Sequence, residues 1–406
     1  MRNQIEGSRA IAETVARCRP QVVPAYPITP QTHIVEAVGA MVKDGTLVPC
    51  EFITVESEFA ALSAAIGASA AGARTYTATA SQGLLYMAEA LFNAAGLGMP
   101  IVMTVANRAI GAPINIWNDQ SDAMSQRDCG WIQLYAEDNQ AAVGLHVIAF
   151  RLAEALSLPV MVCVDGFVLT HAVEPIEVPS TEQVDRFLPG YRPRQVLDPD
   201  EPVTIGAMVG PEAFTEVRYL AHHQLNRASG RFAELAADFA AVTGQQTPST
   251  VSTYRTDGAR TVVVALGSVT GTVKDTIDEY DVPVGLATLT MYRPFPADEV
   301  HRALADVEHV IVLERAFAPG AGGVVSADVR MALAGTAKRI STVVAGLGGR
   351  AVTKASLSAM LDDAHGGRLP DLSFLDLRTD IVAREIARLD VDADATDRPI
   401  DAARIG

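Results

Sequence analysis

The stretch RTYTATASQGLLYMAEALFNAAGLGMPIVMTVA (74–106) decides the fold class. Its two ends, 74–80 and 100–106, are short runs rich in β-branched residues, with the length and composition of buried strands. The alanine- and leucine-rich segment between them predicts a helix that is capped by Ser81 and ends near Gly96. A strand, a helix and a second strand in this order indicate two parallel strands joined by a crossover helix.

The same alternation continues on both sides of this stretch. Thr29 followed by Pro30 predicts a helix start, because a capping residue precedes a proline at the first helical position. An alanine-rich helix is predicted to open at Glu58. Strands that alternate with helices indicate an α/β fold with a parallel sheet covered on both faces. The further predicted strands are QVVPAYPIT (21–29), FITV (52–55) and PVMVCVD (159–165).

The alternation stops after about residue 171 and returns at about residue 259. Six prolines between 175 and 202 separate short polar runs, which is typical of a connection that wraps a domain surface. A helix over about 212–243 interrupts this connection. A second α/β unit follows, with strands predicted at TVVVALGS (261–268), VGLATL (284–289), HVIVLE (309–314) and STVVAG (341–346). The expected segments are an α/β domain (1–171), a connection with a helix (172–258), a second α/β domain (259–350) and a helical end with a frayed acidic tail (351–406).

Composition excludes several classes of protein. The chain has 406 residues, a formal net charge of −16 and four cysteines. An acidic chain is poorly suited to grip nucleic acid or anionic lipid over a broad surface. The cysteines lie at least 32 residues apart, so no CxxC pair is available for zinc or for an iron–sulfur cluster. No signal peptide or membrane span is evident, and we expect a cytoplasmic protein without a metal site of its own.

Three polar motifs follow predicted strands. They are YPITP (26–30), VESEFAA (55–61) and ANRAIGAPINIWNDQSD (106–122). In an open α/β sheet the carboxyl ends of the strands are where ligands bind. We therefore expect the three motifs to meet at one crevice.

Each motif by itself has an ordinary structural explanation. Thr29 can simply cap a helix, and Glu56 and Glu58 can compensate a helix dipole. Arg108 can form a structural salt bridge. Together, however, a hydroxyl, a carboxylate and a guanidinium suit a small anionic substrate beside a cofactor.

Longer motifs carry a resemblance that covers nearly the whole chain. The chain resembles the α subunit of the 2-oxoacid:ferredoxin oxidoreductases, which include pyruvate:ferredoxin oxidoreductase. The motifs are YPITPQT (26–32), VESEFAA (55–61), TATASQGL (77–84), ANRAIGAPINIW (106–117), SDAMSQRDCGWIQLY (121–135), DGFVLTH (165–171), MYRPFP (291–296) and GLGGR (346–350).

The resemblance implies a thiamine-diphosphate enzyme whose site is shared between chains. This chain would supply the pyrimidine-binding domain, with a parallel sheet, and a second α/β domain similar to the transketolase C-terminal domain. A partner β subunit would hold Mg²⁺ and the diphosphate, and the GDG signature of that role is absent here. Iron–sulfur clusters would lie on partner chains, such as γ and ferredoxin-like δ subunits. Ferredoxin or a similar acceptor would take the electrons, and coenzyme A would take the acyl group.

The resemblance also assigns roles to individual residues. Glu58 matches the carboxyl group that hydrogen-bonds the aminopyrimidine ring, and Glu56 lies two residues off that position. Thr29 and Pro30 match cofactor contacts. Arg108 and Thr29 match the positions that bind the substrate carboxylate or its developing oxyanion.

Other polar and aromatic residues near these motifs have more ordinary expectations. Asn115, Asp119 and Asp122 are expected to be solvated loop residues. Arg127 and Asp128 are expected to form an internal ion pair, with a role in shaping the substrate site left open. Trp117 and Trp131 are expected to pack in the domain or at an interface.

The function expected from the resemblance is oxidative decarboxylation of a 2-oxoacid, with pyruvate favoured. Three alternatives stay open. In the first alternative, the substrate is another 2-oxoacid, such as an aryl glyoxylate or oxalate. In the second, the chain is half of a thiamine enzyme that transfers no electrons. In the third, the chain is a non-catalytic assembly subunit with the same fold.

Overall fold

The computed structural model describes residues 2–396 and contains the predicted pair of parallel strands. Strands β4 (Tyr76–Thr79) and β5 (Val102–Asn107) pair in parallel, with Tyr76 opposite Val102. The segment between them forms two helices, α4 (Ser81–Tyr86) and α5 (Ala88–Leu97). The expected cap at Ser81 is wrong. Ala80 holds the cap position, and the Ser81 hydroxyl instead donates to the carbonyl of Ala109 in another loop.

Strands β4 and β5 belong to the first of two large sheets, which has the order β12-β6-β7-β5-β4. Strand β12 alone is antiparallel. A small parallel sheet of β2 (Val22–Ala25) and β3 (Glu51–Thr54) continues it through a parallel bridge from Val22 to Thr75. The other strands of the large sheet are β6 (Ile132–Tyr135), β7 (Val160–Asp165) and β12 (Met291–Arg293).

Helices cover both faces of this first sheet, as expected for a parallel sheet. Along β7, Val160, Val162 and Val164 pack into one apolar cluster, whereas Met161 and Cys163 pack into another. The first cluster includes residues of α1 (Gly7–Arg17), α2 (Thr32–Lys43) and α7 (Asn139–Leu156), and the second includes residues of α3 (Glu58–Ala70), α4 and α5.

Two predicted helix starts have different outcomes. Helix α3 begins at Glu58 as predicted, and the Ser57 hydroxyl caps it by accepting from the Ala60 amide at 3.2 Å. Helix α2 begins at Thr32 with Gln31 at the cap position, so the predicted start at Thr29 and Pro30 is wrong. Those two residues form the turn that leads into the helix, at the carboxyl end of β2.

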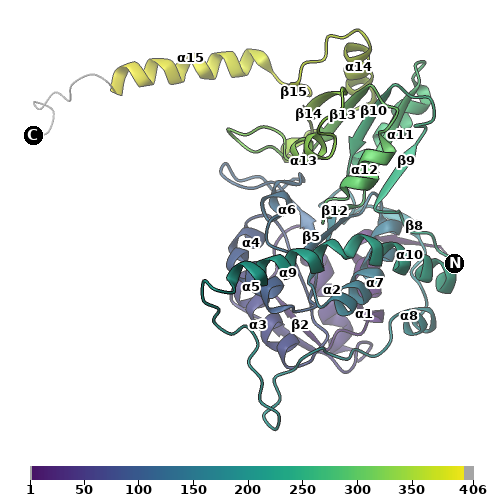
Figure 1. Cartoon of the computed structure of the whole chain (residues 1–406), viewed down its shortest axis with the longest axis vertical. Coiled ribbons are helices and arrows are strands. Elements are labelled where there is room, and N and C mark those ends of the chain that lie inside the picture. Colours follow the sequence, from purple (N-terminus) through teal and green to yellow (C-terminus); the bar gives the residue numbers. More distant parts are fainter. Residues whose placement is uncertain (1, 397–406) are drawn as a thin grey trace, which may run out of the picture.

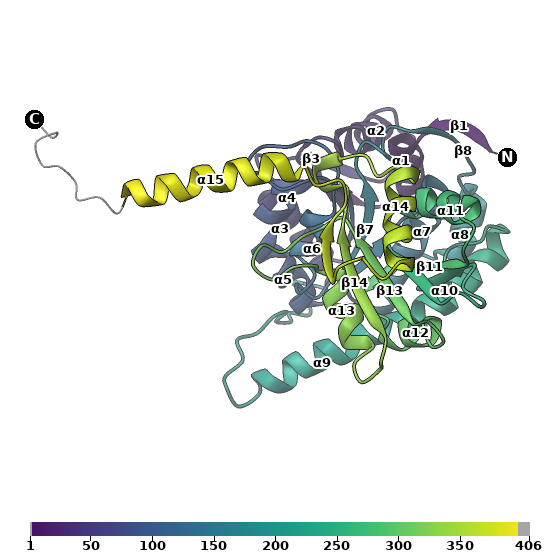
Figure 2. The same cartoon turned by 90° about the horizontal axis from the view of Figure 1, so that it is seen from above.

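The connection after residue 171 is more structured than its prolines indicate. Its first part, β8 (Val173–Ile176), pairs antiparallel with β1 (Asn3–Glu6) near the N-terminus. Helix α8 (Thr181–Phe187) follows, and the expected long helix is two helices, α9 (Phe214–Asn226) and α10 (Ala228–Thr243). Helix α10 buries Phe232 and Phe239 in the same apolar cluster as α7, so this segment wraps the first sheet (Figure 2).

The second large sheet has the order β15-β14-β13-β10-β11-β9 and lies above the first sheet in Figure 1. Its four predicted strands are present, and β9 and β15 are additions that are too short or too polar to stand out in the sequence. Helices α11 and α14 cover one face, and α12 and α13 share an apolar cluster with the first sheet. The elements are β9 (Val251–Tyr254), β10 (Thr261–Ala265), α11 (Val269–Glu279), β11 (Val284–Leu289), α12 (Ala297–Ala303), β13 (His309–Glu314), α13 (Val325–Ala332), β14 (Arg339–Val344), η1 (Leu347–Gly349), α14 (Lys354–His365) and β15 (Leu372–Phe374).

The chain ends in α15 (Thr379–Thr396), which extends away from both sheets (Figure 1). The acidic sequence predicts a frayed tail from residue 390, but the chain is helical as far as Thr396. The rest of the expected tail lies outside the described residues. Within residues 2–396 no helix has the length and apolar character needed to cross a membrane. The segment boundaries at 171, 258 and 350 stay predictions.

Candidate active site

The three candidate residues lie at one edge of the first sheet. Thr29 follows β2, Glu58 follows β3 and Arg108 follows β5, and these strands run in parallel. The first turn of α4 lies between Glu58 and Arg108. Its Gly83 lies against the Glu58 side chain, and its Ser81 hydroxyl donates to the carbonyl of the residue that follows Arg108. The expected convergence of the three motifs is therefore present.

The Glu58 side chain is buried without a protein partner. It is 8% exposed, and its carboxylate accepts no hydrogen bond from any described residue. A Cβ atom at position 83 would lie 2.7 Å from Glu58 Oε1 and 2.6 Å from Thr79 Oγ1, so a side chain there would displace both groups. The buried Thr79 hydroxyl also lacks a partner. Buried polar groups are normally hydrogen-bonded, so this pair indicates a place for a polar ligand.

The Arg108 guanidinium is held in place by two backbone carbonyls. Its Nε donates to Asn115 at 3.0 Å and its Nη1 donates to Thr29 at 2.9 Å. Its Nη2 has no partner among the described residues. Burial lowers the pKa of Arg108, and the nearby charge of Asp122 opposes this effect. Thr29 thus contacts Arg108 through its carbonyl, while its exposed side chain forms no described hydrogen bond.

Asp122 joins the segments that carry this site. Its carboxylate is fully buried and accepts four hydrogen bonds of 2.8 to 3.0 Å. Burial raises the pKa of Asp122 to about 6, against the opposing effect of these hydrogen bonds. The expectation of a solvated loop residue is therefore wrong for Asp122. Its donors are the amides of Ser81, Arg108 and Ala123 and the side chain of Asn107.

The loop after Arg108 is also tied to the second sheet. Asn115 Nδ2 donates to the Gly348 carbonyl at 3.1 Å, and the Gly348 amide donates to Asp119 Oδ2 at 3.0 Å. Asp119 is only 4% exposed, and burial raises its pKa. These two residues therefore fold back against the second domain, and the expectation that they are solvated is wrong.

Asp165 connects the two sheets beside this loop. Its place before Gly166 at the end of a strand indicates only a turn, yet its carboxylate accepts from the Ser268 amide at 2.8 Å and pairs with Arg315 at 3.2 Å. Gln120 Nε2 adds a hydrogen bond of 3.2 Å. The carboxyl ends of β7, β10 and β13 thus meet at one buried polar junction.

Comparisons with known proteins agree with this geometry. Residues 13–237 match the family described as pyruvate flavodoxin/ferredoxin oxidoreductase, thiamine-diphosphate-binding, and residues 259–357 match pyruvate:ferredoxin oxidoreductase core domain II. The chain belongs to this family. The first match covers the segment that carries Thr29, Glu58 and Arg108.

Full-length relatives support the assignment to the family. The chain is 41% identical to pyruvate synthase subunit PorA of Methanosarcina barkeri, over 93% of this chain and 97% of the relative. It is 37% identical to ketoisovalerate oxidoreductase subunit VorA of Pyrococcus abyssi, over 88% and 92%. A solved 2-oxoglutarate:ferredoxin oxidoreductase from Magnetococcus marinus has a TM-score of 0.67 at 19% identity. The match covers 89% of this chain and 65% of that one, and it supports the fold alone.

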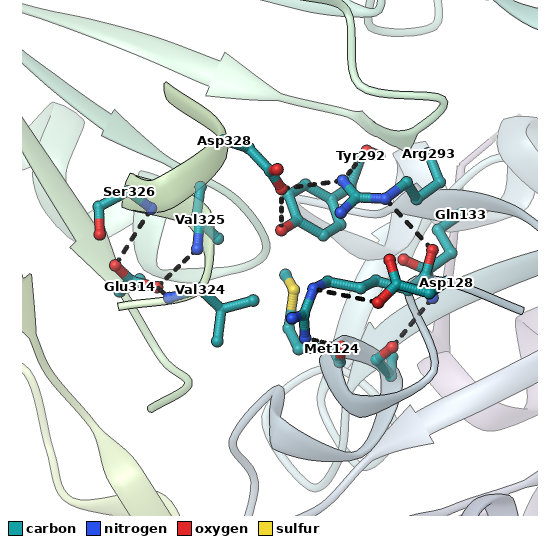
Figure 3. Close-up of polar contacts among 12 residues, drawn as sticks. Met124, Asp128, Gln133, Tyr292, Arg293, Glu314, Val324, Val325, Ser326 and Asp328 are labelled. Carbon is teal, nitrogen blue, oxygen red and sulfur yellow. Dashed lines mark hydrogen bonds and ion pairs between the residues drawn. The ribbon is translucent and has the colours of Figure 1, made fainter. Parts of the chain in front are cut away.

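The MYRPFP motif links the first sheet to helix α13 (Figure 3). In MYRPFP (291–296), Arg293 pairs with Asp328 at 3.0 Å and donates to the Arg127 carbonyl at 3.2 Å. The expected ion pair of Arg127 and Asp128 is present, with charged atoms 3.9 Å apart. It lies at the surface rather than inside the protein, because the Asp128 side chain is 75% exposed.

The tryptophans differ in their surroundings. Trp131 is buried, and its Nε1 donates to the Leu91 carbonyl at 2.9 Å, which confirms the packing expectation. Trp117 is half exposed and lies against Phe167, with ring centroids 4.9 Å apart. It therefore packs on one side and leaves the other side open to solvent or to another chain.

Proposed function

We propose that this chain is the catalytic α subunit of a multi-subunit 2-oxoacid:ferredoxin oxidoreductase, with pyruvate as the favoured substrate. The reaction is oxidative decarboxylation with thiamine diphosphate, which is shared with a partner chain. The observation that carries the proposal is the buried, unpartnered carboxylate of Glu58, next to the same helical turn that anchors the Arg108 loop. Membership of the family supports the proposal that Glu58 and Arg108 form a cofactor and substrate site.

The residues around Glu58 fit the pyrimidine half of thiamine diphosphate. The Glu58 side chain is only 8% exposed and has no hydrogen-bond partner among the described residues, and the buried Thr79 hydroxyl lacks one too. Gly83 has no side chain, which lets Glu58 and Thr79 lie against the first turn of α4. When bound, thiamine diphosphate supplies the electron sink that permits loss of CO₂ from a 2-oxoacid. Glu58 would hold or share a proton with a ring nitrogen at its Oε atoms. Thr29 and Pro30 would contact the same group at the end of β2.

Arg108 and Thr29 would bind the substrate. The two carbonyl contacts fix the guanidinium, so its free Nη2 can meet the substrate carboxylate or its developing oxyanion without reorganisation. The exposed Thr29 hydroxyl would add a hydrogen bond to the same group. Burial strengthens these contacts, since charge-assisted hydrogen bonds are worth more away from water.

Electron transfer would require other chains. The four cysteines are far apart in the sequence, and three of them are buried, so they offer no ligand set for an iron–sulfur cluster. We therefore place Mg²⁺ and the diphosphate on a β subunit, and the clusters on partner chains such as γ and ferredoxin-like δ subunits. Ferredoxin or a similar protein would accept the electrons, and coenzyme A would accept the acyl group. The relatives named as subunits PorA and VorA support a complex of several chains.

Reconstitution with the partner chains tests this proposal. We expect 2-oxoacid-dependent reduction of methyl viologen that requires thiamine diphosphate, with pyruvate ahead of 2-oxoisovalerate, phenylglyoxylate and oxalate. The 37% identity to VorA makes 2-oxoisovalerate the second candidate. The proposal would be overturned if none of these four acids supported the reduction of methyl viologen. The isolated chain should bind thiamine diphosphate and Mg²⁺ only weakly, and tight binding by it alone would contradict a shared site.

A further inference from the structure

Three side chains outside the candidate active site form a compact cluster. Glu6 is the last residue of β1, His33 lies in the first turn of α2 and His171 lies in the turn after β7. One ligand atom from each residue lies within 4.8 Å of the other two. His33 Nδ1 is already 2.8 Å from Glu6 Oε1. Three segments distant in the sequence thus bring two imidazoles and a carboxylate together.

We propose that Glu6, His33 and His171 bind a divalent first-row transition-metal ion, with Zn²⁺ as the reference ion. Imidazole nitrogen combined with one carboxylate oxygen is a donor set that suits Zn²⁺ and its neighbours rather than Mg²⁺ or Ca²⁺. Three protein ligands leave a fourth position for water or for another molecule.

The surroundings of His171 orient its ring for this role. Its Nδ1 is 2.7 Å from Thr170 Oγ1, which also accepts from the Phe167 amide. With Nδ1–H donating to that oxygen, Nε2 is the nitrogen left for a metal. Metal-binding histidines commonly use their second ring nitrogen for such a hydrogen bond, which fixes the tautomer and the ring orientation.

The cluster needs only a small closure to bind an ion. Ligand atoms around a tetrahedral Zn²⁺ lie roughly 3.4 Å apart, given bonds of about 2.0–2.1 Å. The His33 side chain is 51% exposed and the Glu6 side chain is 33% exposed, so both can rotate toward a bound ion. The hydrogen bond between them already holds the carboxylate at one imidazole in the absence of metal.

The ion would brace the segment that carries Thr29. It would join β1, the start of α2 and the turn after β7, while Pro30, just before α2, packs on Gly166 in the same turn. Ring contacts continue outward from the cluster. The ring centroid of His171 lies 4.7 Å from that of His33 and 4.8 Å from that of Phe167, whose ring contacts Trp117. A bound metal ion would therefore also change the surroundings of the Trp117 ring.

Metal titration of the full chain tests this inference without partner chains, thiamine or turnover, so its outcome is independent of the proposed function. The chain is prepared without a histidine tag and stripped of metal, and ZnCl₂ binding is followed by calorimetry. We expect one ion per chain. Glu6→Gln and His33→Ala should each weaken binding by at least about tenfold, the lower end of the loss seen when even an outer partner of a ligand is removed. Circular dichroism checks that both variants fold.

His301→Ala is the matched control, because His301 is an exposed helical histidine with no described side-chain partner. It should bind Zn²⁺ like the unchanged chain. Co²⁺ provides a second readout, since it should quench the fluorescence of Trp117 and leave buried Trp131 nearly unaffected. The quenched part should disappear in Trp117→Phe and in His33→Ala. No stoichiometric binding, binding unchanged in Glu6→Gln and His33→Ala, or an equal loss in His301→Ala would overturn the inference.

Discussion

Two buried carboxylates at the carboxyl edges of the two sheets differ in the hydrogen bonds that they accept. Glu314 ends β13 in the second sheet and accepts hydrogen bonds from three successive backbone amides at the start of α13 (Figure 3). Glu58 follows β3 at the edge of the first sheet and accepts none from the described residues. Both are buried, with exposures of 2% and 8%.

The difference separates a carboxylate that the protein itself satisfies from the one that we propose for a ligand. An unpartnered buried carboxylate destabilises the fold, and such groups concentrate at functional sites. Glu314 stabilises its surroundings, whereas Glu58 remains available. Both residues lie at the carboxyl end of a strand, so position alone does not distinguish them. Their hydrogen-bond partners distinguish them.

The largest effect is expected for Glu58→Gln in the reconstituted complex. Pyruvate-dependent viologen reduction should fall by about 10²- to 10⁴-fold, the range of general acid–base contributions, because the amide cannot share a proton. Assembly should be unchanged and the free energy of unfolding should not fall, since no protein hydrogen bond is lost and an unpartnered buried charge is removed. Glu56→Gln is the control, because it makes the same change two residues away at an exposed position. Near-normal turnover in Glu58→Gln, or an equal loss in both variants, would remove Glu58 from this role.

Glu314→Gln should have the converse effect. It replaces an acceptor oxygen by an NH₂ group that faces backbone N–H donors, and the charge that these amides stabilise is lost. We expect the free energy of unfolding in urea to fall by about 3 kcal/mol, the scale for breaking a buried charged contact. Glu308→Gln, which changes an exposed glutamate paired with Arg260, should cost much less, because solvent screens an exposed ion pair. Equal losses in the two variants would contradict the structural role of Glu314.

Arg108→Lys should affect catalysis more than stability. A lysine ammonium cannot contact the carbonyls of Asn115 and Thr29 and also present a third fixed donor. The loss of one charge-assisted hydrogen bond, about 1.5–3 kcal/mol, should lower kcat/KM by roughly 10- to 100-fold. Steady-state kinetics on pyruvate measures this, with Arg127→Lys, an arginine in the nearby motif, as the control. A loss of stability without a change in kcat/KM would make Arg108 a structural residue like Arg315.

The smallest effect concerns the pH dependence of stability. Burial raises the pKa of Asp122 to about 6 in the folded chain, from 3.8. Between these values the folded state binds more protons than the unfolded state, so this residue's contribution to stability falls as pH rises. Relative to Asp122→Asn, the unchanged chain should therefore lose about 1 kcal/mol of unfolding free energy between pH 5 and 7. Urea unfolding at both pH values measures this difference, and a constant difference would contradict the raised pKa.

Local patterns were enough to predict most of the sheet strands. VGLATL (284–289) and HVIVLE (309–314) match β11 and β13 residue for residue, because each is a short apolar run without helical periodicity. Strand β6 and the splitting of the expected 81–96 helix were missed, since they depend on tertiary contacts. The start of α2 was predicted too early because a proline after a capping residue is also typical of a turn.

The candidate site was predictable only in part. Because ligands bind at strand carboxyl ends, the order of motifs and strands along the chain is enough to predict that Glu58 and Arg108 share one edge. Asp122 and Asp165 were missed, since their partners lie up to 150 residues away in the sequence and no local pattern reports such contacts. Arg108 is held by the carbonyl of Thr29 rather than by its hydroxyl. A contact to the backbone cannot be predicted from the type of residue.

The hydrogen bond between Asn115 and Gly348 offers a route to altered substrate preference. Gly348 has a φ of 57° and lies so close to the Asn115 amide that a side chain there would displace it. Asn115 supplies the carbonyl that holds Nε of Arg108. With Arg108 as the substrate ligand that we propose, directed evolution for bulkier acids would act on the GLGGR turn of the second domain. That turn bears on the position of the Arg108 guanidinium through one intermediate residue, Asn115, although it belongs to a different sheet from Arg108.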